Sequence, residues 1–182
     1  MHATLCDLMA DIVQNSVEAN ATEIMLSVSE DEGTVAFVVK DNGKGMDSGT
    51  KAKAIDPFYS DGVKHPHRRV GLGLPFLFQT AEAAGGRAEI ESEPGAGTTI
   101  RFYAQADHVD LPPFGGFSTT AAMMLSQMSA GELKIVRERN GGNYSLSRTE
   151  LDEALGGLQS ADSLNLLKTY IASQEDELRK AG

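Results

Sequence analysis

The chain has 182 residues, somewhat more than the about 150 of a typical domain, so one full domain with an additional segment is expected. Hydrophobic residues make up 41% and charged residues 23%, which excludes a wholly disordered or fibrous chain. The formal net charge of −10 repels phosphate backbones, so we expect no nucleic-acid partner. The chain has no apolar run of membrane-spanning length, no signal-peptide pattern and a single Cys6, so we expect a cytoplasmic protein without a membrane partner.

The first hundred residues alternate between helical and strand patterns. Apolar residues at three- and four-residue spacing predict an amphipathic helix from Leu5 to Val17. Strands are expected at 23–29 and 34–40, a helix at 72–84, and two further strands at 87–93 and 98–104. Residues 42–70 carry many Gly, Pro and charged residues without a sustained period, which indicates a functional or mobile stretch.

The composition changes after residue 106, where a linker or docking turn is expected at 110–116. A helix at 119–128, a hairpin at 132–146 and a capping box from Ser147 to Glu150 follow. The last helix, about 161–178, has an apolar row that we expect to pack on a protein surface, either its own, a second copy or a partner. That row consists of Leu164, Leu167, Tyr170, Ile171 and Leu178. We therefore expect two units, 1–106 and an α+β appendage at 107–182.

Asp11 and Asn15 lie four residues apart on the first helix and so project from one face. An amide oxygen suits Mg²⁺, and the carboxylate beside it could orient a water molecule. Taken alone, this pair is equally typical of a solvated helix face.

A second motif, 41–46, follows directly after a hydrophobic strand. Asp41 at the strand end can accept a hydrogen bond from an exocyclic amine, and Gly43 and Gly45 permit close approach of a flat ligand before Met46. The alternative is a tight turn that closes a hairpin. The spacing fits neither an EF-hand loop nor a P-loop.

A third motif, Gly71, Leu72 and Gly73, stands where the irregular stretch meets a helix. Free N–H groups at a helix N-terminus form a phosphate site, although a plain helix-entry turn has the same composition. No strand precedes these glycines, which argues against a dinucleotide-binding fingerprint.

The order of these motifs, ending with Gly97-Thr98-Thr99 at the start of a strand, resembles the GHKL superfamily of gyrase, heat-shock chaperone, histidine kinase and mismatch-repair ATPases. The resemblance covers about residues 3–104. It implies an α/β fold, a two-layer Bergerat-type sandwich with a mixed sheet covered by helices on one face, here followed by the small α+β appendage.

The resemblance also implies a role for each matched position. Asn15 would ligate Mg²⁺, and Asp41 would bind the adenine amine. The other positions that would contact ATP are Gly43, Gly45, Met46, Gly71, Leu72, Gly73 and Thr99. Residues 46–70 match a flexible lid which, counted from Lys44, holds six Lys or Arg against three Asp, as expected for a segment that faces phosphates.

In function, the resemblance implies a Mg-ATP-binding domain that transfers a phosphoryl group to water or to a protein partner, with Asp11 acting on the water. Hydrolysing members commonly have Glu where Asp11 stands, so a non-catalytic ATP-dependent switch, or a protein-binding regulator of the anti-sigma kind, is the alternative. A DNA-linked ATPase is disfavoured by the acidic charge. A protein partner or a homodimer is expected in either case.

Overall fold

A computed structural model describes residues 4–56, 73–128 and 131–181 of the chain. Six strands form one sheet: β1 (Glu23–Asp31), β2 (Thr34–Asp41), β3 (Arg87–Glu93), β4 (Gly97–Gln105), β5 (Glu132–Arg139) and β6 (Gly142–Ser147). Their order in the sheet is β3-β4-β2-β1-β5-β6. All neighbours are antiparallel except β1 and β5, which are parallel, so the predicted mixed sheet is confirmed.

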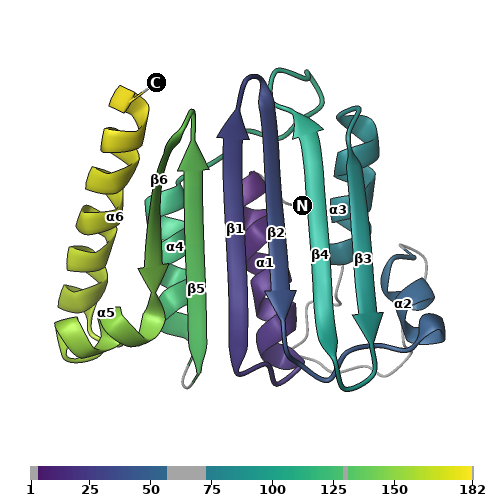
Figure 1. Ribbon diagram of the computed structural model, residues 1–182, viewed down its shortest axis with the longest axis horizontal. Helices are drawn as coiled ribbons and strands as arrows, with labels where there is room; N and C mark the ends of the chain where they lie inside the picture. Colours follow the sequence, from purple (N-terminus) through teal and green to yellow (C-terminus); the bar gives the residue numbers. More distant parts are fainter. Residues whose placement is uncertain (1–3, 57–72, 129–130, 182) are drawn as a thin grey trace.

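Six helices accompany the sheet: α1 (Leu5–Glu18), α2 (Ser48–Ala54), α3 (Gly73–Ala83), α4 (Phe117–Gln127), α5 (Arg148–Leu155) and α6 (Ala161–Ala181). Figure 1 shows α1, α3 and α4 together behind the sheet, with the strands open toward the viewer. This is the two-layer arrangement that the resemblance implied. None of the helices in the described ranges is long and apolar enough to cross a membrane.

Helix α1 forms as its sequence pattern predicts. Thr4 caps its N-terminus in a capping box, in which the side chains of Thr4 and Asp7 each bind the other residue's backbone N–H. The apolar face of the helix, including Leu8 and Ile12, is fully buried. Beside this apolar face, Asp11 is exposed and Asn15 half-buried.

Helix α2 lies inside the stretch that was predicted to be irregular, so that prediction is wrong over residues 48–54. The Asp47 side chain accepts a hydrogen bond from the Thr50 backbone N–H at 2.7 Å, and this bond lowers the pKa of the Asp47 carboxyl. No residue of α2 is buried, so its sequence has no apolar period that could reveal it. The rest of the expected lid, 57–70, lies outside the described residues.

The sheet continues across residue 106, because β5 pairs with β1 from Glu23 opposite Glu132 to Glu30 opposite Arg139. One buried apolar cluster accordingly includes residues from both parts of the chain, such as Met9 and Leu133.

The segment predicted as a linker or docking turn docks onto the start of α1. The carbonyls of Pro113 and Phe114 accept hydrogen bonds from the N–H groups of Leu5 and Cys6, both at 2.9 Å. Helix α6 packs mainly on α4. Leu167, Ile171 and Leu178 of its apolar row are buried in this chain, whereas Tyr170 is exposed.

Candidate functional site

The carboxylate of Asp41, at the end of β2, lies buried between α1 and β4. Its Oδ2 accepts a hydrogen bond from the Ser16 hydroxyl at 2.6 Å. Its Oδ1 accepts from the backbone N–H groups of Gly43, at 2.8 Å, and Thr98, at 3.2 Å. All three donors are neutral, and no ion pair to Asp41 is recorded within the described part of the chain. The site therefore holds a carboxylate that is fixed in place by neutral donors, without a cation beside it in the described residues.

Asn42 fixes the backbone that carries Asp41. Its Oδ1 accepts hydrogen bonds from the N–H groups of Thr22 and Glu23 at 2.9 and 3.0 Å, and its Nδ2 donates to the Thr22 hydroxyl at 3.0 Å. The side chain thus joins the end of β2 to the turn between α1 and β1. Sequence reasoning did not single out Asn42 or Ser16, and their signal is only their place beside Asp41 and Asn15.

The two glycines after Asp41 allow close contacts within the protein itself. A Cβ at Gly43 would lie 2.9 Å from the Ala19 carbonyl oxygen, and one at Gly45 would lie 1.9 Å from the Glu93 carbonyl oxygen. Gly45 also has a φ of +65°, which favours glycine. The next residue, Met46, donates its N–H to the Ser92 hydroxyl at 2.8 Å. The Asp41–Met46 segment is therefore held between α1 and the β3–β4 hairpin.

The threonine beside Asp41 is Thr98. Its N–H binds the Asp41 carboxylate, and its hydroxyl lies 2.9 Å from that of Ser92. Thr99, the threonine selected from the sequence, pairs with Lys40 on β2 and Glu91 on β3. Since side chains alternate along a strand, Thr99 points to the opposite face of the sheet from Thr98 and is not brought to Asp41.

Helices α1 and α3 bring the other candidates together. A Cβ at Gly73, the first residue of α3, would lie 3.2 Å from the Asp11 Cβ and 3.9 Å from the Asn15 Nδ2. The start of α3 therefore meets the polar face of α1. Gly71 and Leu72, together with Lys64, Arg68 and Arg69 of the expected lid, lie outside the described residues.

The donors at this junction suit Mg²⁺ held jointly with a phosphate group. Asn15 offers one amide oxygen, a hard ligand of the kind that Mg²⁺ takes alongside water and phosphate oxygens. The described residues contain no group of three or more His, Cys, Asp or Glu side chains that could hold a metal ion.

A second buried polar cluster lies in the C-terminal part. Arg137 on β5 is fully buried and forms ion pairs with Glu30 and with Glu175 on α6, the latter at 3.1 Å. The Tyr144 hydroxyl donates to the same Glu175 carboxylate at 2.7 Å, and burial together with this bond raises the pKa of Tyr144. Sequence reasoning missed this cluster.

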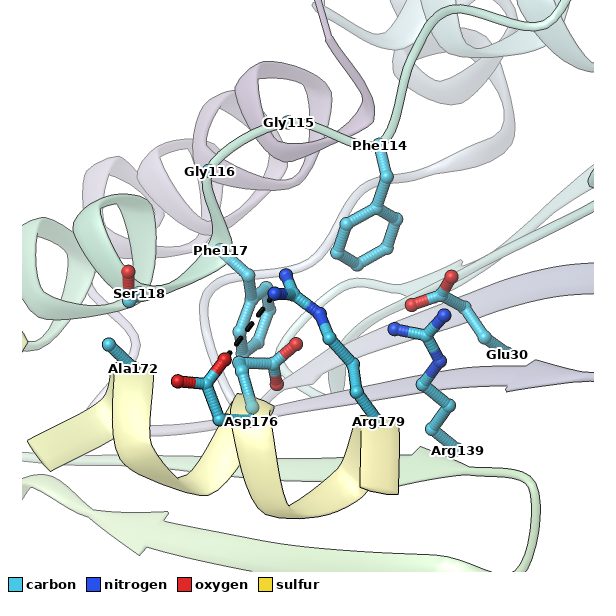
Figure 2. Close-up of a pocket in the computed structure, with 11 residues that line it drawn as sticks. Glu30, Phe114, Gly115, Gly116, Phe117, Ser118, Arg139, Ala172, Asp176 and Arg179 are labelled. Atoms are coloured by element: carbon cyan, nitrogen blue, oxygen red, sulfur yellow. Dashed lines mark hydrogen bonds and ion pairs between the residues drawn. The ribbon is translucent and has the colours of Figure 1, made fainter. Parts of the chain in front are cut away.

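Aromatic rings and a pocket complete the surroundings of Arg137. Its guanidinium lies over the rings of Phe114 and Phe117, 4.9 and 5.3 Å from their centres. Figure 2 shows both rings in the wall of a pocket of about 450 Å³, with Arg179 bonded to Asp176 at its side. Arg137 on β5 thus contacts both the segment around the start of α4, through Phe114 and Phe117, and helix α6, through Glu175.

A family model described as "Histidine kinase-, DNA gyrase B-, and HSP90-like ATPase" matches residues 2–108. The sensor histidine kinase YxdK of Bacillus subtilis is 29% identical over 98 residues, covering 52% of this chain and 30% of the relative. The sensor-type histidine kinase PrrB of Mycobacterium tuberculosis is 32% identical over 89 residues, covering 48% of this chain and 20% of the relative. The chain thus spans less than a third of the length of these relatives.

Among solved structures, the N-terminal domain of a DNA repair protein has a similar fold, with a TM-score of 0.58 and 15% sequence identity. The match covers 90% of this chain and 59% of the chain in that structure. At this identity the likeness concerns the fold alone. It extends beyond residues 2–108, so the six-stranded sheet with its C-terminal strands and helices has a counterpart in a known structure.

Proposed function

The chain belongs to the histidine kinase-, DNA gyrase B- and HSP90-like ATPase family, and from this premise we propose that it binds Mg-ATP and transfers the terminal phosphoryl group to water or to a protein partner. The observation that carries the proposal is the buried Asp41 carboxylate, whose hydrogen-bond donors among the described residues are all neutral. A buried charge is costly unless it is compensated. The exocyclic amine of adenine is a donor that would use the remaining capacity of this carboxylate.

Each residue would have a distinct task. Asp41 binds the base, with Thr98 in the place first given to Thr99, and Gly43, Gly45 and Met46 shape the adjoining wall. Gly73, the first residue of α3, would offer its N–H group to the phosphates, as would Gly71 and Leu72, which precede it in the sequence. Asn15 holds Mg²⁺, which neutralises phosphate charge when bound. Asp11, exposed on the same helix face, orients the attacking water.

The division of labour along the chain is part of the proposal. Residues 1–106 would carry the nucleotide site, and 107–182, which extend the same sheet, would transmit its state to a protein partner. Histidine kinase relatives support a signalling role of this kind. A non-catalytic switch is the second candidate, because Asp11 is one methylene shorter than the glutamate of hydrolysing family members.

Calorimetric titration with ATP tests the binding role. Asp41→Asn should weaken binding about ten- to a hundredfold, since a hydrogen bond to a charged group contributes about 1.5–3 kcal/mol. Asp31→Asn, the same change at an exposed position at the end of β1, is the matched control and should bind as the wild type does. Equal affinity of all three proteins would refute the assignment of Asp41.

Steady-state ADP release distinguishes the two candidates. If the protein is an ATPase, Asp11→Asn should abolish turnover and leave ATP binding nearly intact, whereas Asn15→Ala should weaken the Mg²⁺-dependent part of binding. If wild type and Asp11→Asn release ADP equally slowly, with and without candidate partners, the switch is the better account.

A further inference from the structure

One face of the sheet is left uncovered by the described elements. Helices α1, α3 and α4 all lie on the other face (Figure 1), and α6 reaches the sheet on that same covered face, through Arg137 and Tyr144. In β1 the residues that face the helices, such as Leu26 and Val28, are buried. Met25, which precedes Leu26 and points to the other face, is 40% exposed. The open face is therefore a broad, six-stranded surface.

Strand register arranges this open face in three rows across β2, β1 and β5. The middle row is uncharged and small, and the two outer rows differ in charge. The upper row is Lys40, Met25 and Lys134; the middle row is Val38, Ser27 and Val136; the lower row is Ala36, Ser29 and Glu138. The middle row is thus uncharged on these three central strands, as a packing surface requires, and it continues on β4 and β3 with Arg101 and Glu89.

The charges that flank the centre differ in whether they are already paired. On β3 and β4, Arg101 binds Glu91 at 2.9 Å and Arg87 binds Glu89 at 3.6 Å. On β5, by contrast, no ion pair is recorded for the side chains of Lys134 and Glu138 within the described part of the chain. These two lie four residues apart on one strand, about 13 Å, too far to pair with each other.

We propose that this open face binds the same face of a second copy of the chain. A half-turn about an axis along the middle row exchanges the two outer rows. It therefore sets Lys134 of one copy opposite Glu138 of the other, twice by symmetry. The same rotation stacks Val38 and Val136 on their own counterparts, with the strands of the two sheets nearly aligned. It also brings Arg101 onto its own counterpart, where each guanidinium keeps its pairing with Glu91 of its own chain.

The whole face is close to the size that such a contact needs. Six strands at about 4.8 Å spacing span about 24 Å, and eight residues at about 3.3 Å span about 26 Å, or about 600 Å² before side-chain relief is added. This approaches the about 800 Å² that each partner contributes to a stable interface. Met25 and Tyr103, both on this face, are large hydrophobic residues that remain exposed, at 40% and 37%.

Sedimentation equilibrium of the full chain over a range of concentrations tests the proposal. The wild type should form a dimer. Lys134→Glu and Glu138→Lys should each raise its dissociation constant about tenfold or more, since each brings like charges together twice. The double variant, Lys134→Glu with Glu138→Lys, restores opposite charges across the axis and should recover the wild-type constant. Val136→Asp should abolish the dimer by placing two carboxylates at the middle row.

Matched controls separate this face from general charge effects. Lys168→Glu on α6 and Glu82→Lys on the exposed side of α3 make the same charge changes away from the open face and should leave the dimer intact. Thermal melts of every variant establish that the fold is retained. A wild type that stays monomeric, or a dimer that the single variants do not weaken or the double variant does not restore, would overturn the proposal. Its outcome does not depend on ATP, so it can fail while the proposed function stands.

Discussion

Two buried charges, one in each part of the chain, are treated in opposite ways. Asp41 is held by three neutral donors, the Ser16 hydroxyl and two backbone N–H groups, and no cation is recorded beside it in the described residues. Arg137 is surrounded by Glu30, Glu175 and two aromatic rings, so its charge is compensated within the chain. A buried charge that is fixed but not neutralised suits a ligand site, whereas a neutralised one holds elements together.

The same contrast appears in the elements that each charge joins. The Asp41 cluster is made by backbone that approaches closely at Gly43 and Gly45, with short side chains around it. The Arg137 cluster is made by long side chains from strands and a helix far apart in the sequence. We therefore expect changes at Arg137 to reduce stability above all, and changes around Asp41 to reduce ATP binding above all.

Arg137→Met should have the largest effect. It leaves Glu175 and Glu30 without their cation, and breaking a buried ion pair in this way costs about 3–5 kcal/mol of unfolding free energy. Urea denaturation measures the loss. Arg139→Met, two residues along the same strand and half-buried, should change stability by about 0.5 kcal/mol or less. A small loss for Arg137→Met would show that its cluster is not what fastens α6 to the sheet.

Gly45→Ala should cost about 2–3 kcal/mol of stability, because the new Cβ would lie 1.9 Å from the Glu93 carbonyl oxygen at a φ of +65°. Gly95→Ala is a matched control, since Gly95 has a φ of +76° but nothing within 4 Å of the added Cβ. Its loss should be about 1–2 kcal/mol, the cost of the backbone conformation alone. Equal losses at both positions would remove the close approach as the reason for Gly45.

The elements that could be predicted from the sequence are those whose burial gives them a period. Helix α1 and strands β1 and β2 were found within two residues at each end, because their apolar residues recur at helical or strand spacing. Helix α2 was missed because it buries nothing. The parallel pairing of β1 with β5 has no local signal, since more than a hundred residues separate the two strands.

The candidate site was predictable to a similar degree. Asp41, Asn15 and Gly73 were selected from motif order and stay predictions as site residues, and α1 and α3 bring the last two side by side. The choice between Thr98 and Thr99 required the strand register, because the two residues differ only in which face of the sheet they occupy. Arg137 could not be found, because its partners Glu30 and Glu175 lie 107 and 38 residues away.

Ser16→Ala should weaken ATP binding about tenfold while reducing stability by about 1 kcal/mol, because the change removes one of the three hydrogen bonds that fix the Asp41 carboxylate. Calorimetric titration and urea denaturation of the same variant measure the two effects. The control is Ser173→Ala, at an exposed position of α6 where the hydroxyl donates to a backbone carbonyl. It should change neither the affinity for ATP nor the stability. Unchanged affinity in Ser16→Ala would mean that the carboxylate needs no help from α1.

A pH dependence of stability arises at Cys6, where α1 meets the Arg137 cluster. Burial raises the pKa of the Cys6 thiol from its ordinary value of 9.0 to about 12. In the unfolded chain the thiol ionises near pH 9, whereas the folded chain keeps its proton until about pH 12. The stability due to the protonated thiol is thus fully present below pH 9 and is lost as the pH rises, by up to about 1.4 kcal/mol for each pH unit.

Urea denaturation at pH 8 and pH 10 should show this loss of stability in the wild type and a smaller loss in Cys6→Ala. Tyr144, whose pKa is also raised, adds its own loss only above about pH 10, outside this window. An equal fall in Cys6→Ala would assign the pH dependence to other groups and remove Cys6 from the account.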